Sequence, residues 1–516
     1  MSNKYTLVKS KIPIIQFECP SDTKSVFLDT LKDHVYDLTT IPSYVEHIKF
    51  GEHFNQIIKK NDLPAELQSL KFQSIFNQII EKDVLPAGLK SLVFGCNFNQ
   101  KIEKDVLPAG LKSLVFGFYF NQKIEKDVLS AKLKSLVFGY YFDQIIEKDV
   151  LPAGLKSLSF GYRYNQLIKN NVLPTGLKSL VCSAFFNQLI EKDVLPTELQ
   201  SIQFGVEFDQ PIDQYVLPLG LQSVVFGHHY NQPIKKDVLP AGLQSIEFIR
   251  NFNQRIEKDV LPSGLQSINF SHYYNQPIDK DVLPAELQSI VFGMNFNQKI
   301  EKGVLPSGLQ SIQFGYYFDQ LIEKDVLPAE LQSIKFGCYF NQKIEKNVLP
   351  SKLESIKFGS KFNQYIDYDV LPVELKSIRF GCEFNQPIKK DVLPAGLQTI
   401  VFGYYYNQPI EKNVLPDGLQ SIVFDNIFKQ PLNNIPNKTK LYFNDFCLDM
   451  TRNYTIYRRN HSLLKVIIQN VNAGEIYTSK IIDDEYYMSD VEIINPDINK
   501  EKIKNLILQL EVELQF

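Results

Sequence analysis

A repeat with a period of 22 residues constrains the fold of this chain more than any other feature. Phe or Tyr opens the same phrase in eighteen copies without a slip in spacing. These aromatic residues stand at positions 54, 76, 98, 120, 142, 164, 186, 208, 230, 252, 274, 296, 318, 340, 362, 384, 406 and 428. Self-similarity at a fixed period of this length predicts one array of stacked units rather than several globular domains.

The residue pattern inside one copy predicts a short strand. We number the columns of the repeat from the leucine of the phrase LKSLVFG, so that Leu111 is column zero and Phe120 is column nine. Columns three and five are apolar, as in Leu114 and Phe116, and they alternate with a variable column four. This period of two is typical of a strand. Proline near the end of the copy, as at Pro108, opposes a long helix there.

One copy cannot fold alone, because ordering 22 residues costs more free energy than its few buried apolar side chains provide. Stacking identical coils removes this deficit, since each coil covers the next and each strand pairs with the next. The sequence therefore predicts a β-rich solenoid of 22-residue coils with a continuous parallel sheet.

Two polar columns and one glycine column carry further information. Column ten is Asn or Asp in seventeen copies, and column eleven is Gln in all eighteen. Stacked about 4.8 Å apart, their amides are expected to hydrogen-bond from coil to coil as ladders; a row of ligand-binding amides is the alternative. Column six is Gly in thirteen copies, but Ile249 in that column indicates that a positive φ is not required.

The two ends of the chain depart from the repeat and predict caps. Residues 23–26 (TKSV) resemble the strand phrase, so residues 1–40 are expected to form an N-terminal cap with a degenerate coil. Residues 41–436 form the solenoid, with about eighteen copies. Residues 437–516 are expected to form a small α+β C-terminal cap, with a strand-like run at 463–468 and a helix after Asn499.

Composition excludes several classes of protein. The net charge of -3 and the pI near 6.2 give no general attraction to nucleic acid or to anionic membranes. No signal peptide and no apolar run of membrane-spanning length is visible, so we expect a soluble, monomeric cytoplasmic protein, in the host cytoplasm if it is viral. Six scattered cysteines, seven histidines and the absence of catalytic motifs predict no metal, no cofactor and no enzyme activity.

The aromatic phrase resembles a known repeat family. Residues 384–388 (FNQPI), 230–234 (YNQPI) and 208–212 (FDQPI), each followed by Leu-Pro-x-x-Leu-x-Ser-Ile or a close variant, look like the FNIP repeat. That family is known mainly from social amoebae and from giant DNA viruses of amoebae. The resemblance covers residues 41–432 and implies a leucine-rich-repeat-like fold, although Asn stands at column ten here instead of column eight. Many relatives carry an N-terminal F-box, which residues 1–40 do not resemble.

Three functions remain open on this evidence. We expect a non-catalytic scaffold that binds a protein partner through the face of the solenoid, because such arrays offer a long continuous surface. One alternative is a substrate adaptor for a ubiquitin ligase without its own F-box. Another is a structural spacer or adhesive protein with no specific partner.

The candidate partner-binding residues lie in columns that escape the packing constraint. Column one holds Lys90, Lys112, Lys134, Lys156 and Lys178, column four holds Val93, Val115, Val137 and Val181, and the variable columns seven and eight hold Tyr140 and Tyr141. An apolar strip flanked by cations suits an acidic, partly apolar partner segment. Duplication alone is the alternative explanation, because Asp83, Asp105, Asp127 and Asp149 are repeated just as regularly.

Overall fold

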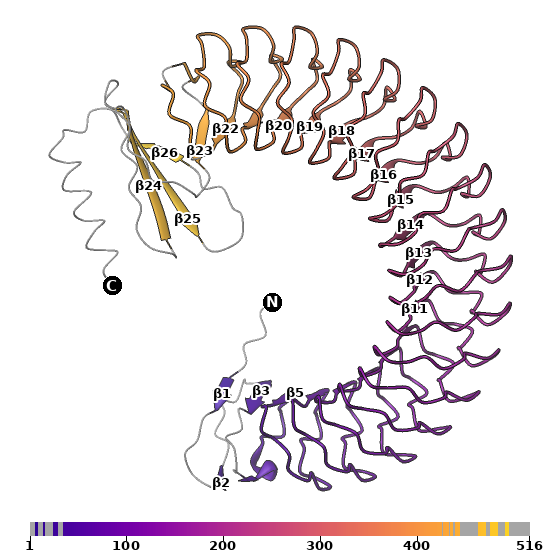
Figure 1. Cartoon of the computed structure of the whole chain (residues 1–516). Helices are drawn as coiled ribbons and strands as arrows, with labels where there is room; N and C mark the ends of the chain where they lie inside the picture. Colours follow the sequence, from indigo (N-terminus) through magenta and orange to yellow (C-terminus); the bar gives the residue numbers. More distant parts are fainter. Residues whose placement is uncertain are drawn as a thin grey trace. The chain divides into compact units, whose positions relative to one another are not determined.

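The computed structural model describes residues 6–8, 14–15, 24–28, 35–425, 427–432, 434–436, 439–443, 463–470, 475–482 and 491–494. By backbone packing the chain divides into two compact units, residues 1–287 and 288–516. Figure 1 labels the strands along the chain. Each unit is described by itself below.

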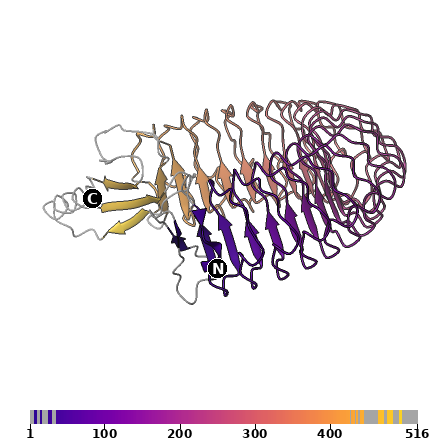
Figure 2. The same ribbon diagram turned by 90° about the horizontal axis from the view of Figure 1, so that it is seen from below.

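The first unit is a stack of coils, each of which contributes one short strand to a parallel sheet. Its elements are β1 (Thr6–Val8), β2 (Ile14–Ile15), β3 (Ser25–Leu28), β4 (Val35–Tyr36), η1 (Leu38–Thr40), β5 (His47–Phe50), β6 (Ser69–Lys71), β7 (Ser91–Val93), β8 (Ser113–Val115), β9 (Ser135–Val137), β10 (Ser157–Ser159), β11 (Ser179–Val181), β12 (Ser201–Gln203), β13 (Ser223–Phe226), β14 (Ser245–Phe248) and β15 (Ser267–Asn269). Strand β3 pairs in parallel with β5, and the strands from β5 to β15 pair in parallel in chain order (Figure 2). Paired residues are 22 positions apart, as Ser113 of β8 and Ser135 of β9 are. Strand β1 adds to β3 in parallel, and β2 pairs separately with β4.

The second unit continues the same coil design and ends in a different sheet. Its strands are β16 (Ser289–Val291), β17 (Ser311–Gln313), β18 (Ser333–Lys335), β19 (Ser355–Lys357), β20 (Ser377–Arg379), β21 (Thr399–Val401), β22 (Ser421–Phe424), β23 (Lys440–Phe443), β24 (Leu463–Asn470), β25 (Glu475–Ile482) and β26 (Val491–Ile494). Strand β23 still pairs in parallel with β22, but over a shorter offset that joins Ser421 to Lys440. Strands β24, β25 and β26 form an antiparallel sheet.

The predicted β-solenoid of 22-residue coils is therefore confirmed, and the only helix among the described residues is the single turn η1. The helix expected after Asn499 lies outside the described residues. The strand-like run predicted at 463–468 forms most of β24.

Two rows of stacked aromatic rings, from columns five and nine, form the centre of each unit's core. Within one coil the ring centroids of Phe116 and Phe120 lie 3.8 Å apart, and between coils those of Phe120 and Phe142 lie 6.1 Å apart. Both faces of such a ring are covered by other rings, so a coil without neighbours would expose them to water. Cys182 replaces Phe in column five, and burial raises the pKa of its thiol to about 12.

The polar columns ten and eleven connect neighbouring coils by hydrogen bonds. Oδ1 of Asn99 accepts a bond of 2.9 Å from the backbone N–H of Asn121 and one of 3.1 Å from the side-chain amide of Gln122. Where the column holds Asp143, a carboxylate oxygen accepts the equivalent two bonds from the next coil. The predicted ladder is confirmed, and its acceptor lies in column ten.

Column six favours glycine because two coils approach each other closely there. A Cβ atom added to Gly139 would collide with the carbonyl oxygen of Gly117 in the preceding coil. The column-six glycines that the structure describes do not have a positive φ, as the presence of Ile249 in the same column predicts. Where Ile249 replaces glycine, the strand pairing extends one residue further, to Phe226 and Phe248.

The backbone is left-handed in column sixteen, which contains Asp83, Asp105, Asp127 and Asp149. Duplication alone is therefore not the reason that aspartate repeats there. The φ angle is 66° at both Asp105 and Asp127, a conformation that Asp, Asn and Gly adopt more readily than other residues. Most of the aspartates in this column also face a lysine of the preceding coil, as Asp105 Oδ2 lies 3.1 Å from Lys82 Nζ. Tyr215 departs from the column with a φ of 67°, and the ammonium group of Lys192 lies 5.4 Å from its ring centroid.

Removing one acceptor of the column-ten ladder should destabilise the fold. Asn99→Leu leaves two donors of the next coil without a partner, so we expect the free energy of unfolding to fall by about 2 kcal/mol. Asn99→Asp keeps an acceptor oxygen between the uncharged Asn77 and Asn121 and should cost less than about 1 kcal/mol. Urea denaturation followed by circular dichroism compares the two variants. Equal losses would show that the acceptor is not what holds the coils together.

Candidate functional site

The side chains available to a partner are those that point away from the aromatic core. Strand side chains alternate between the two faces of a sheet, so columns three and five point into the core and columns two and four point outward. Column one precedes the strand, and columns seven and eight follow it. The residues in these outward columns are the candidates for binding.

The five lysines of column one lie at the surface of the first unit. Lys90, Lys112, Lys134 and Lys178 are exposed, and Lys156 is half-buried. Nζ of Lys134 donates a hydrogen bond of 3.0 Å to the carbonyl oxygen of Gly154. Lys156 makes the equivalent bond to Gly176 and lies 4.0 Å from the carboxylate of Glu198. Among the residues that the structure describes, the other four lysines form no ion pair, so the row keeps its positive charge.

The four predicted valines of column four end their strands on the outward face. Val93, Val115, Val137 and Val181 are all half-buried. In one coil Lys134 and Val137 are three residues apart along an extended segment, which separates their Cα atoms by roughly 10 Å at 3.3 Å per residue. The lysine row therefore lies before the strands and the valine strip at their ends.

The two predicted tyrosines belong to rows of stacked side chains that follow the strands. Tyr140 stacks between Phe118 and Tyr162, with ring centroids 4.5 Å apart on each side. Tyr141 stacks on Tyr119 with centroids 5.2 Å apart. The structure thus joins residues of columns seven and eight from neighbouring coils into one aromatic surface.

Sequence reasoning named only two members of this aromatic surface and missed the more accessible ones. Phe118, Tyr119 and Tyr162 have exposed fractions of 39%, 49% and 42%, whereas Tyr140 and Tyr141 are half-buried between their neighbours. The signal was present in the sequence, because residues 118–119 and 140–141 fill columns seven and eight with aromatics in two consecutive copies.

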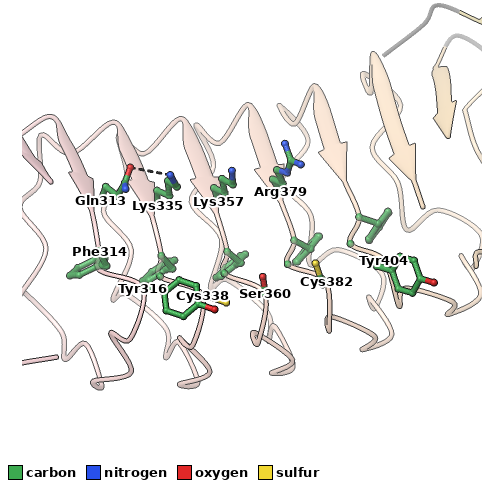
Figure 3. A pocket seen from close by; sticks show the side chains of 18 of the residues that line it. Gln313, Phe314, Tyr316, Lys335, Cys338, Lys357, Ser360, Arg379, Cys382 and Tyr404 are labelled. Atoms are coloured by element: carbon green, nitrogen blue, oxygen red, sulfur yellow. Dashed lines mark hydrogen bonds between the residues drawn. The ribbon is translucent and has the colours of Figure 1, made fainter. Parts of the chain in front are cut away.

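A groove of about 420 Å³ crosses the outward face of the second unit. It passes over strands β17 to β20 and the turns that follow them (Figure 3). One row of lining side chains comes from column four of these strands and consists of Gln313, Lys335, Lys357 and Arg379. A second row comes from column seven of the turns and consists of Tyr316, Cys338, Ser360, Cys382 and Tyr404.

The column-four row of this groove places three cations side by side. The parallel register sets Lys335 opposite Lys357 and Lys357 opposite Arg379. Partial burial of the Lys357 ammonium group, together with the charges of Arg379 and Lys335, lowers its pKa below the ordinary value of 10.5. Nζ of Lys335 donates a hydrogen bond of 3.1 Å to Oε1 of Gln313. In the described part of the chain none of the three cations forms an ion pair.

Several lysines of other columns in the same unit lie beside carboxylates. Nζ of Lys376 lies 2.7 Å from Oε1 of Glu354, and Nζ of Lys352 lies 2.7 Å from Oε1 of Glu330. The column-four cations have no such carboxylate neighbour among the described residues. Sequence reasoning missed them, although reading column four copy by copy gives Lys, Lys and Arg in succession at 335, 357 and 379.

The described residues contain no arrangement that points to metal chemistry or to insertion in a membrane. Within the described ranges, His, Cys, Asp and Glu side chains form no group of three that could hold a metal ion. No helix in that part of the chain has the length and apolarity needed to cross a bilayer.

Removing the central cation of the groove should stabilise the fold. Like charges directly opposite in a sheet are unfavourable, so Lys357→Gln should raise the free energy of unfolding by roughly 0.2–1 kcal/mol at low salt. The gain should shrink at high salt, where screening already weakens the repulsion. Thermal unfolding at two salt concentrations measures it. The matched control is Lys346→Gln, which removes a lysine 2.6 Å from Asp369 and should give no gain.

The same variant has a signature in pH. Because folding lowers the pKa of Lys357, the unfolded chain binds more protons between the two pKa values, and stability rises with pH toward 10.5. Lys357→Gln should lack that part of the rise. An unchanged pH profile, or a loss of stability at low salt, would contradict the account of the row.

Comparison with known proteins identifies the repeat. A family model described as FNIP Repeat matches residues 37–74, 76–119, 120–163, 142–182, 164–207, 186–229, 208–251, 230–273, 252–295, 274–317, 296–339, 340–383, 384–426 and 406–446. A search of curated proteins found no match.

Thirteen solved chains are similar to this one. Among them is the crystal structure of CroV588, a giant-virus protein described as a novel circular LRR protein. It is 42% identical, with a TM-score of 0.75, and the alignment covers 81% of this chain and 61% of that one. This chain therefore spans somewhat less than two-thirds of the length of that relative. The FNIP Repeat model matches most of the length of the present chain, which therefore belongs to the FNIP repeat family.

Proposed function

We propose that this protein is a non-catalytic scaffold that binds a protein partner through the outward face of its repeat solenoid. The observation that carries this proposal is the aromatic surface of the first unit, where Phe118, Tyr119 and Tyr162 remain exposed although their rings stack in order. Tyrosine is enriched among the residues that dominate binding energy at protein interfaces. Repeat solenoids of the leucine-rich kind are commonly interaction folds and are typically not enzymes.

The lysine row and the valine strip extend this aromatic surface across the strands. In the coil that begins at Leu133, Lys134 precedes the strand, Val137 ends it and Tyr140 follows it, and all three are at least partly accessible. A surface that combines stacked rings, half-buried valines and unpaired cations is complementary to an acidic, partly apolar protein segment. The overall net charge of -3 favours a protein partner over nucleic acid or an anionic membrane.

A triple substitution tests this surface. Lys112→Gln, Lys134→Gln and Lys156→Gln introduce the residue that later copies carry in column one, as at Gln200, so folding should be unaffected. A partner recovered by affinity purification from the native cell should then bind roughly tenfold more weakly or worse. The matched control is Lys82→Gln, Lys104→Gln and Lys126→Gln, which removes the same charge from column fifteen of the same unit and should leave affinity unchanged.

The outcomes separate the three functions that the sequence leaves open. Unchanged affinity of the column-one variant at low salt would place the binding site elsewhere. Recovery of ubiquitin-ligase subunits as the partner would make the protein a substrate adaptor. Recovery of nothing that depends on the lysine row or the aromatic surface would favour a structural spacer.

A further inference from the structure

We propose that the groove of the second unit binds an extended acidic segment of a protein partner, with carboxylates held by Lys335, Lys357 and Arg379. This proposal rests on the proposed function in one respect, namely that the ligand is a protein. It concerns a separate surface, in residues 288–516, and a ligand of stated chemistry.

The fold does not require the cationic row. The same position holds Val291 and Val401 in other coils of this unit, so the fold does not need a charge there. Three like charges in direct register oppose folding. Arg379 keeps the positive charge with a different side chain. A ligand that neutralises these charges would remove their cost to folding.

Carboxylates of the described residues do not compensate the charge of the row. Lys376 and Lys352 reach carboxylates of the preceding coil, but the described residues give Lys335, Lys357 and Arg379 no ion pair. Their side chains extend in one row from neighbouring strands (Figure 3). A ligand lying across the strands would meet all three cations at once.

The length of the groove matches that of a short extended peptide. Neighbouring parallel strands are about 4.8 Å apart, so the three cations span roughly 10 Å and the groove from Tyr316 to Tyr404 spans roughly 19 Å. An extended chain rises about 3.3 Å per residue, so about six residues fill this length. Carboxylates on alternate residues of such a segment would be spaced about 6.6 Å apart, a mismatch that the flexible lysine and arginine side chains can absorb.

The shape of the groove supports an extended polypeptide. Tyr316 and Tyr404 stand at the two ends of the turn row, with exposed fractions of 43% and 39%, and the small side chains of Cys338, Ser360 and Cys382 lie between them (Figure 3). The small residues leave room for a chain to lie along the turns. The two tyrosine rings offer apolar contact to side chains at either end of the segment.

The cations occupy only part of the groove, which continues as far as Asp425, one coil beyond Tyr404. The carboxylates of the ligand should therefore lie over the stretch from Lys335 to Arg379.

Peptide binding to the full chain tests this proposal. The probe is a fluorescein-labelled decapeptide of alternating glutamate and leucine with glycine ends, and its matched control carries glutamine in place of glutamate. Fluorescence anisotropy at low salt should show binding of the glutamate peptide only. The variant Lys335→Gln, Lys357→Gln and Arg379→Gln, which introduces the residue found at Gln313, should bind it roughly tenfold more weakly or worse.

A second triple variant controls for total charge. Lys302→Gln, Lys324→Gln and Lys346→Gln remove three charges from consecutive coils of the same unit, at column fifteen, and should leave peptide binding unchanged. Thermal unfolding verifies that all variants are folded. Equal weakening by the two triple variants, equal binding of the two peptides, or no binding of either would overturn the proposal. Tighter binding of a single-stranded oligonucleotide through the same three cations would also overturn it.

The result is separable from that of the proposed function. The affinity of the captured partner could be unchanged by the column-one substitutions while the glutamate peptide still requires Lys335, Lys357 and Arg379. That result would contradict the binding surface proposed for the first unit and support the groove. Conversely, the partner could require the lysine row while the affinity of the peptide is unchanged by substitution of these three cations. That result would contradict the proposed groove site and support the proposed function.

Discussion

Hydrogen bonds from one coil to the next, made at an unvarying offset, hold this solenoid in register. The side-chain oxygen of Asn99 accepts from the backbone and the glutamine of the following coil, and each coil in turn supplies the same acceptor. The aromatic rings stack in the same order, so that Phe120 is covered by rings of its neighbours. Both interactions require that equivalent atoms return every 22 residues, and this explains why the spacing never slips in eighteen copies.

The requirement for register separates the columns into two groups. Columns that meet the next coil inside the structure keep their chemistry, whereas columns on the outward face vary without disturbing the stack. Variation there can accumulate into surfaces, because neighbouring copies place the same column side by side. The aromatic surface around Tyr140 and the cationic row around Lys357 are both built in this way, from single positions repeated in adjacent coils.

The repeat columns predict much of the fold because each column samples one structural position many times. This repeated sampling predicts the strand, the parallel pairing and the column-ten ladder. It also predicts that the column-six glycines lack a positive φ. The reason for glycine at Gly139 does not follow, because it depends on how closely the carbonyl of Gly117 approaches. The left-handed backbone at Asp105 was likewise hidden, since a regular aspartate column is also what duplication produces.

The candidate surfaces were only partly visible in the sequence, for a related reason. The column-one lysines stand out as five identical residues in succession, whereas the groove combines two different cations with a second row of mixed residues. Whether Lys335, Lys357 and Arg379 have carboxylate partners depends on side-chain reach between coils, which a column does not record. The structure supplies that information, because it places Lys376 beside Glu354 and gives the column-four cations no such neighbour among the described residues.

Deletion of one period tests most directly whether each coil depends only on its neighbours. Removing residues 208–229 joins Glu207 to Tyr230 and recreates a column-eight to column-nine junction that already exists in the chain. Removing residues 208–218 takes away half a period and destroys the register beyond it. Thermal unfolding followed by circular dichroism should show a cooperative transition close to that of the parent for the first deletion and a large loss of stability for the second. Similar melting of the two deletion variants would contradict the account.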